Sequence, residues 1–160
     1  MIFSELLLGF VLLIAVGVYL YRRHGFSETP RTPQASPPEG PNYSRITDPR
    51  LAAVILMVQL VRSDKMMTAQ EKIAIMDIMG EELGVEDRQS MFEEAWRLTE
   101  QRGFFSHVSD QLLPMLQERL TQKELLDLAD MLQQVAEANE GGPSELKLSS
   151  VGRFRKRLAA

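Results

Sequence analysis

An uninterrupted apolar run near the start of the chain is the feature that most limits what this sequence can fold into. Residues 6–21 (LLLGFVLLIAVGVYLY) contain no charged, amide or aliphatic hydroxyl side chain. With residues 2–5 in front, the segment reaches about 20 residues, enough for an α-helix to cross a hydrocarbon core of about 30 Å. We therefore predict a single transmembrane anchor over residues 1–24. The side chains that we expect to meet the bilayer or its surface are Leu6, Leu13, Tyr19, Tyr21, Arg22 and Arg23.

The charges beside this run predict its orientation. Arg22 and Arg23 follow the run directly, whereas no Lys or Arg precedes it. Basic residues that flank a span stay on the cytoplasmic side, so we expect the short N-terminus outside and the remainder in the cytoplasm. The predicted location is the bacterial inner membrane. Gly9 and Gly17 share one face of the span without forming a GxxxG motif, which leaves homo-oligomerisation open but favours an ordinary span.

A cleaved signal peptide is the alternative interpretation of the same residues. It would need a basic segment before the apolar run and a cleavage site of small residues after it. The run is followed instead by the bulky and basic sequence RRHGF. The sequence therefore favours an uncleaved anchor.

The rest of the chain divides into a linker and one domain. Residues 25–47 hold five prolines between Pro30 and Pro41, with Gly, Ser and Thr among them. Such a composition cannot bury apolar area, so we predict a disordered, Pro-rich linker that spaces the domain from the bilayer. Residues 48–160 are long enough for one modest cytoplasmic domain with a single core.

Composition and charge exclude several classes of site. The chain contains no cysteine, which excludes disulfides, thiol catalysis and Cys-based metal sites. Residues 51–152 hold 18 Asp and Glu against 9 Lys and Arg, an acidic balance that argues against nucleic acid as a partner. The basic segment 153–157 either complements the C-terminal end of a final helix, which we favour, or contacts anionic lipid.

Helical periodicity predicts the fold class of the domain. Asp48 and Pro49 mark a helix start before the segment 51–61, which is apolar on every face and suits a buried central helix. A buried strand would also accommodate its β-branched residues, but the cap and the length favour a helix. Capping boxes at residues 68–71 and 121–124 start two further helices.

Turn residues separate the remaining predicted helices. Gly84 is expected to end the second helix and Gly103 the third, while Pro114 is expected to kink a fourth or to mark its first turns. A last helix is expected over residues 144–158. Because no stretch alternates with the period of a strand, the predicted fold is an all-α bundle of five to six short helices.

The sequence offers no set of residues typical of an enzyme. It contains no Gly-rich phosphate loop, no nucleophile elbow and no HExxH motif. His107 lies beside Ser106 and Ser109, but adjacent positions on a helix do not face each other and no carboxylate orients the imidazole. We therefore predict a non-enzymatic protein.

Two segments resemble the TerB-like domain family, which includes the tellurite-resistance protein TerB and the region preceding the J domain of the membrane-anchored co-chaperone DjlA. Residues 51–85 (LAAVILMVQLVRSDKMMTAQEKIAIMDIMGEELGV) are similar to its first helical hairpin, in which an Asp in the turn precedes a Glu by seven positions. Asp64 and Glu71 occupy those places. A related pattern recurs over residues 128–158. The chain contains no His-Pro-Asp tripeptide, so the resemblance does not extend to the J domain.

The resemblance implies a divalent-metal site between the two paired turns, built from Asp64, Glu71 and Glu145. Oxygen ligands of this kind suit Ca²⁺, Mg²⁺ or Mn²⁺. However, Lys65 stands where the family has Gly, and the Asp of the second motif is replaced. The structural interpretation, in which Glu71 completes a capping box, is therefore favoured, and we predict neither a cofactor nor a catalytic residue.

These observations predict a membrane-anchored interaction or scaffold module with an unidentified protein partner. An envelope- or metal-stress role of the tellurite type follows from the resemblance alone. Two alternatives stay open: a divalent-metal sensor that uses the acidic turn residues, and a lipid-binding module that uses the basic segment 153–157.

Overall fold

The computed structural model describes residues 41–64, 66–101, 103–139 and 141–159. The predicted anchor over residues 1–24 and most of the predicted linker lie outside these residues. Within them the chain forms one short 3₁₀ helix, six α-helices and no strand, so the prediction of an all-α fold is confirmed. The elements are η1 (Tyr43–Arg45), α2 (Pro49–Arg62), α3 (Ala69–Glu81), α4 (Arg88–Leu98), α5 (Phe105–Arg119), α6 (Gln122–Glu137) and α7 (Glu145–Leu158). No described helix is both long and apolar enough to cross a membrane.

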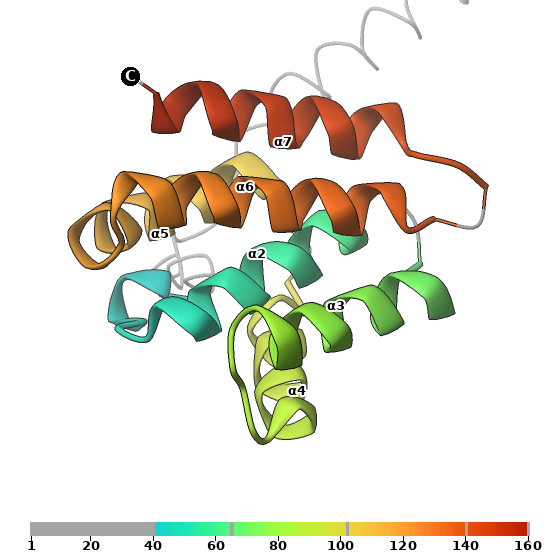
Figure 1. Cartoon of the computed structure of the whole chain (residues 1–160), viewed down its shortest axis with the longest axis horizontal. Helices are drawn as coiled ribbons and strands as arrows, with labels where there is room; N and C mark the ends of the chain where they lie inside the picture. Colours follow the sequence, from blue (N-terminus) through green and yellow to red (C-terminus); the bar gives the residue numbers. More distant parts are fainter. Residues whose placement is uncertain (1–40, 65, 102, 140, 160) are drawn as a thin grey trace, which may run out of the picture. The chain divides into compact units, whose positions relative to one another are not determined.

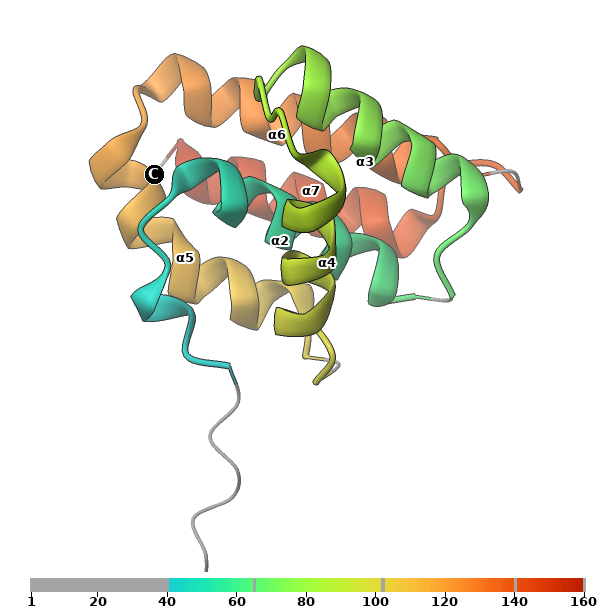
Figure 2. The ribbon, with the colours of Figure 1, turned by 90° about the horizontal axis from the view of Figure 1, so that it is seen from below.

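Helix α2 forms the centre of the domain. Every side chain from Ala52 to Val61 is buried, as its predominantly apolar sequence predicted, and Gln59 is the one polar side chain among them. Figure 2 shows α2 surrounded by the other helices, with α4 crossing it and α5 alongside. Helices α6 and α7 lie side by side as an antiparallel hairpin (Figure 1). A helix with apolar side chains on every face is stable only when other helices cover all of those faces, which explains why α2 lies at the centre.

Local capping signals place most helix ends where the sequence predicts them. The carboxylate of Asp48 accepts a hydrogen bond from the backbone N–H of Arg50 at 2.8 Å, and Pro49 occupies the first helical position. Both predicted capping boxes, at residues 68–71 and 121–124, are present. Gly84 has a φ of 60°, the left-handed conformation that ends a helix at low cost when the residue is glycine.

One predicted helix end needs correction, because α4 ends at Leu98 rather than at Gly103. The hydroxyl and the backbone N–H of Thr99 both bond to the carbonyl oxygens of Ala95 and Trp96. The next N–H, that of Glu100, bonds to the carbonyl oxygen of Arg97, three residues back, instead of continuing the α-helical pattern. Of the two roles predicted for Pro114, the structure excludes a place in the first turns, because Pro114 lies well inside α5. Its ring is exposed rather than packed in the core.

The folded domain also begins before residue 48. Tyr43, at the end of the predicted linker, is only 4% exposed, and its hydroxyl donates a hydrogen bond to the carbonyl oxygen of Leu98 at 2.9 Å. Burial raises the pKa of the Tyr43 phenol, and the nearby positive charge of Arg62 partly offsets this. The described fold therefore includes Tyr43, because its hydrogen bond ties it to the last residue of α4 and η1 also lies beside α5.

Candidate functional site

The turn between α2 and α3 meets the turn that precedes α7. Ser144 is the N-cap residue of α7, and its hydroxyl donates a hydrogen bond to the carboxylate of Asp64 at 2.7 Å. This contact joins residues 80 positions apart in the sequence. It brings the N-termini of α3 and α7 close together, at the place where the family resemblance implies a site.

A buried ion pair joins these two helix starts. Glu71 lies in the first turn of α3 and has a side chain that is 0% exposed, and Lys147 lies in the first turn of α7 with a side chain that is 2% exposed. One carboxylate oxygen of Glu71 accepts from the ammonium group of Lys147, and the other accepts from the backbone N–H of Thr68 at 2.8 Å. A charge buried this deeply needs a partner of opposite sign, and each residue supplies it for the other.

The residues that the resemblance implies as metal ligands are thus only partly brought together. Asp64 and Glu71 lie near the two turns, whereas Glu145 is an exposed residue of the first turn of α7. Among the described residues, no three Asp, Glu or His side chains gather closely enough to hold a metal ion. The ammonium group of Lys147 supplies the positive charge beside Glu71.

Lys147 was missed by the sequence interpretation, although a signal for it was present. Thr68 and Glu71 are the N-cap and third helical residues of α3, and Ser144 and Lys147 hold the same two positions in α7. Glu71 and Lys147 therefore hold equivalent positions in the two hairpins. This shared position was a signal for Lys147, but its pairing with Glu71 also depends on how α3 and α7 approach each other.

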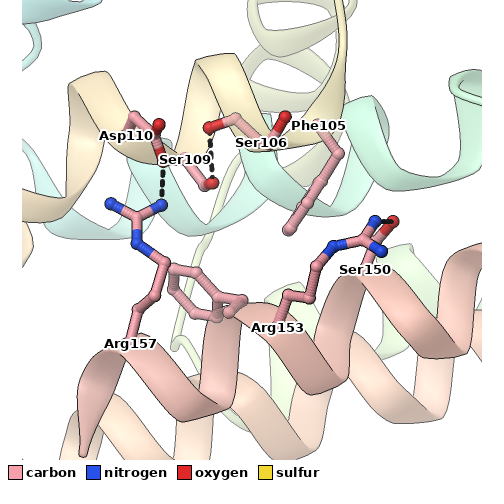
Figure 3. Close-up of a pocket in the computed structure, with 8 residues that line it drawn as sticks. Phe105, Ser106, Ser109, Asp110, Ser150, Arg153 and Arg157 are labelled. Carbon is pink, nitrogen blue, oxygen red and sulfur yellow. Dashed lines mark hydrogen bonds and ion pairs between the residues drawn. The ribbon is translucent and has the colours of Figure 1, made fainter. Parts of the chain in front are cut away.

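A pocket of about 340 Å³ lies between α5 and α7 (Figure 3). Its lining carries two arginines, three serines, two aromatic rings and one carboxylate. The residues are Phe105, Ser106, Ser109, Asp110, Ser150, Arg153, Phe154 and Arg157. The rings of Phe105 and Phe154 meet edge to face, with centroids 6.1 Å apart, and form an apolar wall.

Hydrogen bonds hold both guanidinium groups of this pocket. Arg153 donates to the Ser150 hydroxyl at 3.2 Å, and Arg157 pairs with the carboxylate of Asp110 across the two helices. Figure 3 shows Arg157 extending from α7 to Asp110 on α5, whereas Arg153 turns toward Ser150 on its own helix. The basic segment 153–157 therefore does more than complement the end of its own helix.

A second concave region, of about 380 Å³, lies where α2, α3 and α6 meet. We call it the acidic groove. Apolar side chains of Ala53, Leu83, Leu120, Leu128 and Met131 line it, together with Pro49. Its charged lining residues are Glu82, Glu124, Asp127 and Arg50, which leaves a net charge of −2.

The carboxylate of Glu124 is held in its charged form by local hydrogen bonds. The backbone N–H of Thr121 donates to it at 2.7 Å and the Thr121 hydroxyl donates at 2.8 Å. These bonds lower the pKa of Glu124 below its ordinary value. The acidic groove therefore keeps this negative charge under mildly acidic conditions.

No described hydrogen bond joins His107 to Ser106 or Ser109. The hydroxyl of Ser109 donates to the carbonyl oxygen of Ser106 at 2.9 Å, and His107 pairs with Gln111 at 2.8 Å. Both contacts follow helical spacing. The predicted membrane residues Leu6, Leu13, Tyr19, Tyr21, Arg22 and Arg23 lie outside the described residues.

Comparison with known proteins leaves the chain without an assigned family. No family model, no curated protein and no solved structure matches it.

Proposed function

We propose that this protein is a membrane-anchored, non-enzymatic interaction module whose helical domain docks a partner in the acidic groove. The single observation that supports this function is the composition of the groove, an apolar floor with a negative rim. Such a surface suits a helical segment that presents apolar side chains on one face and Lys or Arg at its edges, because it buries apolar area and pairs charges.

The geometry of the groove supports one partner segment rather than a broad contact. Three helices supply its walls, and its volume falls at the lower end of the range for ligand pockets. The apolar anchors of a short helix, spaced at three and four residues, would fill such a space. Met131 is half-buried in the wall and adds an adaptable thioether to the contact surface.

Site-specific photo-crosslinking tests the proposal in cells. A photoreactive residue at Met131 of the full-length chain should give a discrete adduct, and the crosslinked peptide should map to a basic amphipathic segment of the partner. Reversing two rim charges with Glu82→Lys and Asp127→Lys should abolish the adduct, because the rim then repels a basic segment. Both residues are exposed, so we expect the fold to persist.

A matched charge reversal separates the groove from the general charge of the domain. Glu93→Lys and Glu94→Lys change the net charge equally on α4, where both residues are exposed and neither lines the groove. This variant should retain the Met131 adduct. An adduct that survives reversal of Glu82 and Asp127, or no adduct at all, would refute docking in the groove.

The membrane anchor is part of the same proposal. The apolar run of residues 6–21 and the arginines that follow it support an N-out, C-in span. Fusions of the C-terminus to two reporters, one active only in the periplasm and one active only in the cytoplasm, test this topology. Activity of the periplasmic reporter alone would refute it.

The TerB-like resemblance remains a proposal alongside this function. The meeting of the two interhelical turns at Asp64 and Ser144 supports it, since the resemblance places the paired hairpins next to each other. If the domain is TerB-like, a role in envelope or metal stress would follow from the resemblance to that family.

A further inference from the structure

We propose that the pocket between α5 and α7 binds a phosphate group. The site goes beyond the proposed docking function, because it shares no lining residue with the acidic groove. It is the place in the described part of the chain where a cavity, two guanidinium groups and several hydroxyls coincide.

The two arginines reach the pocket from one side. Arg153 and Arg157 are four residues apart on α7, so their side chains share one helix face. Figure 3 shows Arg157 turned toward Asp110 and Arg153 turned toward Ser150, so an anion in the pocket would lie between the two guanidinium groups. Each guanidinium carries five N–H donors, and the bonds to Ser150 and Asp110 engage one nitrogen of each. No other hydrogen bond within the described part of the chain engages these two groups, and their remaining donors can form the paired, planar contacts that guanidinium groups make with phosphate oxygens.

The opposite wall completes a site for a tetrahedral anion. Ser106 and Ser109 line the pocket from the first turns of α5, and Figure 3 shows them across the pocket from the arginines. The Ser109 hydroxyl donates to the carbonyl oxygen of Ser106, and the Ser150 hydroxyl donates to that of Leu146. Among the described hydrogen bonds none engages the Ser106 hydroxyl, which can therefore donate to an anion. Phe105 and Phe154 exclude water along one side, which strengthens the electrostatic interactions inside.

Asp110 regulates how much positive charge the pocket offers. Its carboxylate pairs with Arg157 at the edge of the pocket, so the charged lining residues sum to +1. A bound phosphate must share Arg157 with this carboxylate. Neutralising Asp110 should therefore strengthen phosphate binding, an effect opposite to that expected from removing either arginine.

Two sources could supply the phosphate, a soluble phosphate compound or the headgroup of an anionic phospholipid. Both present the same oxyanion to the arginines. The experiment therefore has two arms, each with the full-length chain. In one arm the chain is held in maltoside micelles and is titrated with inorganic phosphate in a buffer that contains no sulfate. In the other arm it is placed in nanodiscs of phosphatidylcholine without or with phosphatidic acid.

The readout is the NMR signals of the arginine side chains and of the backbone amides of Ser106 and Ser109. Binding should shift these signals in at least one arm, and the arm that responds identifies the source. Arg153→Gln should weaken binding about tenfold, because a hydrogen bond to a charged group is lost. Asp110→Asn should tighten it.

Lys156→Gln is the matched control. Lys156 is exposed on the same turn of α7, does not line the pocket, and carries the same charge as the arginines. It should leave binding nearly unchanged, whereas a non-specific attraction to the basic segment would weaken equally in the Lys156 and Arg153 variants. Equal weakening, or no shift of the pocket signals in either arm, would overturn the proposal. Neither result affects the Met131 adduct that tests the docking function.

Discussion

Replacing Lys147 with Met should destabilise the domain far more than a typical single substitution. Met matches the length of the lysine side chain, so the substitution removes the positive charge while it keeps most of the packing. Glu71 then keeps a carboxylate that is 0% exposed without its charged partner. The perturbation therefore isolates the electrostatic part of the contact between α3 and α7.

The magnitude follows from the burial of both side chains. Removing one partner of a buried ion pair costs about 3–5 kcal/mol, against about 5–15 kcal/mol for the whole stability of a domain. With a loss of about 4 kcal/mol and an m-value of about 2 kcal/mol per M, the urea midpoint should fall by about 2 M. An exposed pair would cost about 0–1 kcal/mol.

Urea unfolding of residues 39–160, followed by circular dichroism, measures this loss. The fragment contains the whole hydrophobic core of the described residues and forms one compact unit. The double variant Glu71→Gln with Lys147→Met should recover to within about 1–2 kcal/mol of the natural chain, because no unpaired charge remains buried. The amide oxygen that Glu71→Gln introduces can still accept from the Thr68 backbone N–H, which preserves the capping box.

Two outcomes of these unfolding measurements would refute this reasoning. If Lys147→Met alone stays within about 0.5 kcal/mol of the natural chain, the pair is not buried as described. If the double variant is as unstable as the single one, the loss comes from packing rather than from an orphaned charge.

Three further predictions concern other contacts of the domain. Tyr43→Phe should cost about 0.5–1.5 kcal/mol in urea unfolding, because the hydrogen bond to the carbonyl of Leu98 is lost while the ring stays buried; no loss would mean that residues 43–45 do not belong to the fold. An NMR titration should place the pKa of Glu124 below that of an ordinary glutamate, and Thr121→Ala should raise it. Because the folded pKa is lowered, the stability from this carboxylate is present above the unfolded pKa and is lost as the pH falls through the folded one; an unshifted titration in the natural chain would contradict this. Phe154→Ala should cost about 3–5 kcal/mol, since the ring is 1% exposed against Phe105; a loss below about 1 kcal/mol would contradict its place in the core.

Most helix starts and one helix end of the fold can be predicted from local signals in the sequence. Asp48 and Pro49 mark the start of α2, the threonines of the two capping boxes mark α3 and α6, and Gly84 marks the end of α3. Each of these signals acts within about four residues, so it can be recognised from the sequence alone. The long apolar segment of α2 likewise predicts its central position from composition.

Contacts between distant residues could not be predicted in the same way. Tyr43 lies in a segment whose prolines predict a linker, and its burial and its contact with Leu98, 55 positions away, tie it to the domain. The pairing of Glu71 with Lys147 depends on how α3 and α7 approach each other, which no local pattern encodes. The pocket between α5 and α7 and the acidic groove depend on helix packing for the same reason.

Crosslinking from Met131, compared between the full-length chain and a version lacking residues 1–24, tests the central claim most directly. Our account predicts a discrete adduct with a basic amphipathic segment in the full-length chain, and a much weaker one without the anchor, because the anchor raises the local concentration of domain and partner at the membrane. No reproducible adduct from the full-length chain, or an adduct of equal intensity from both forms, would contradict the account of a membrane-anchored docking module.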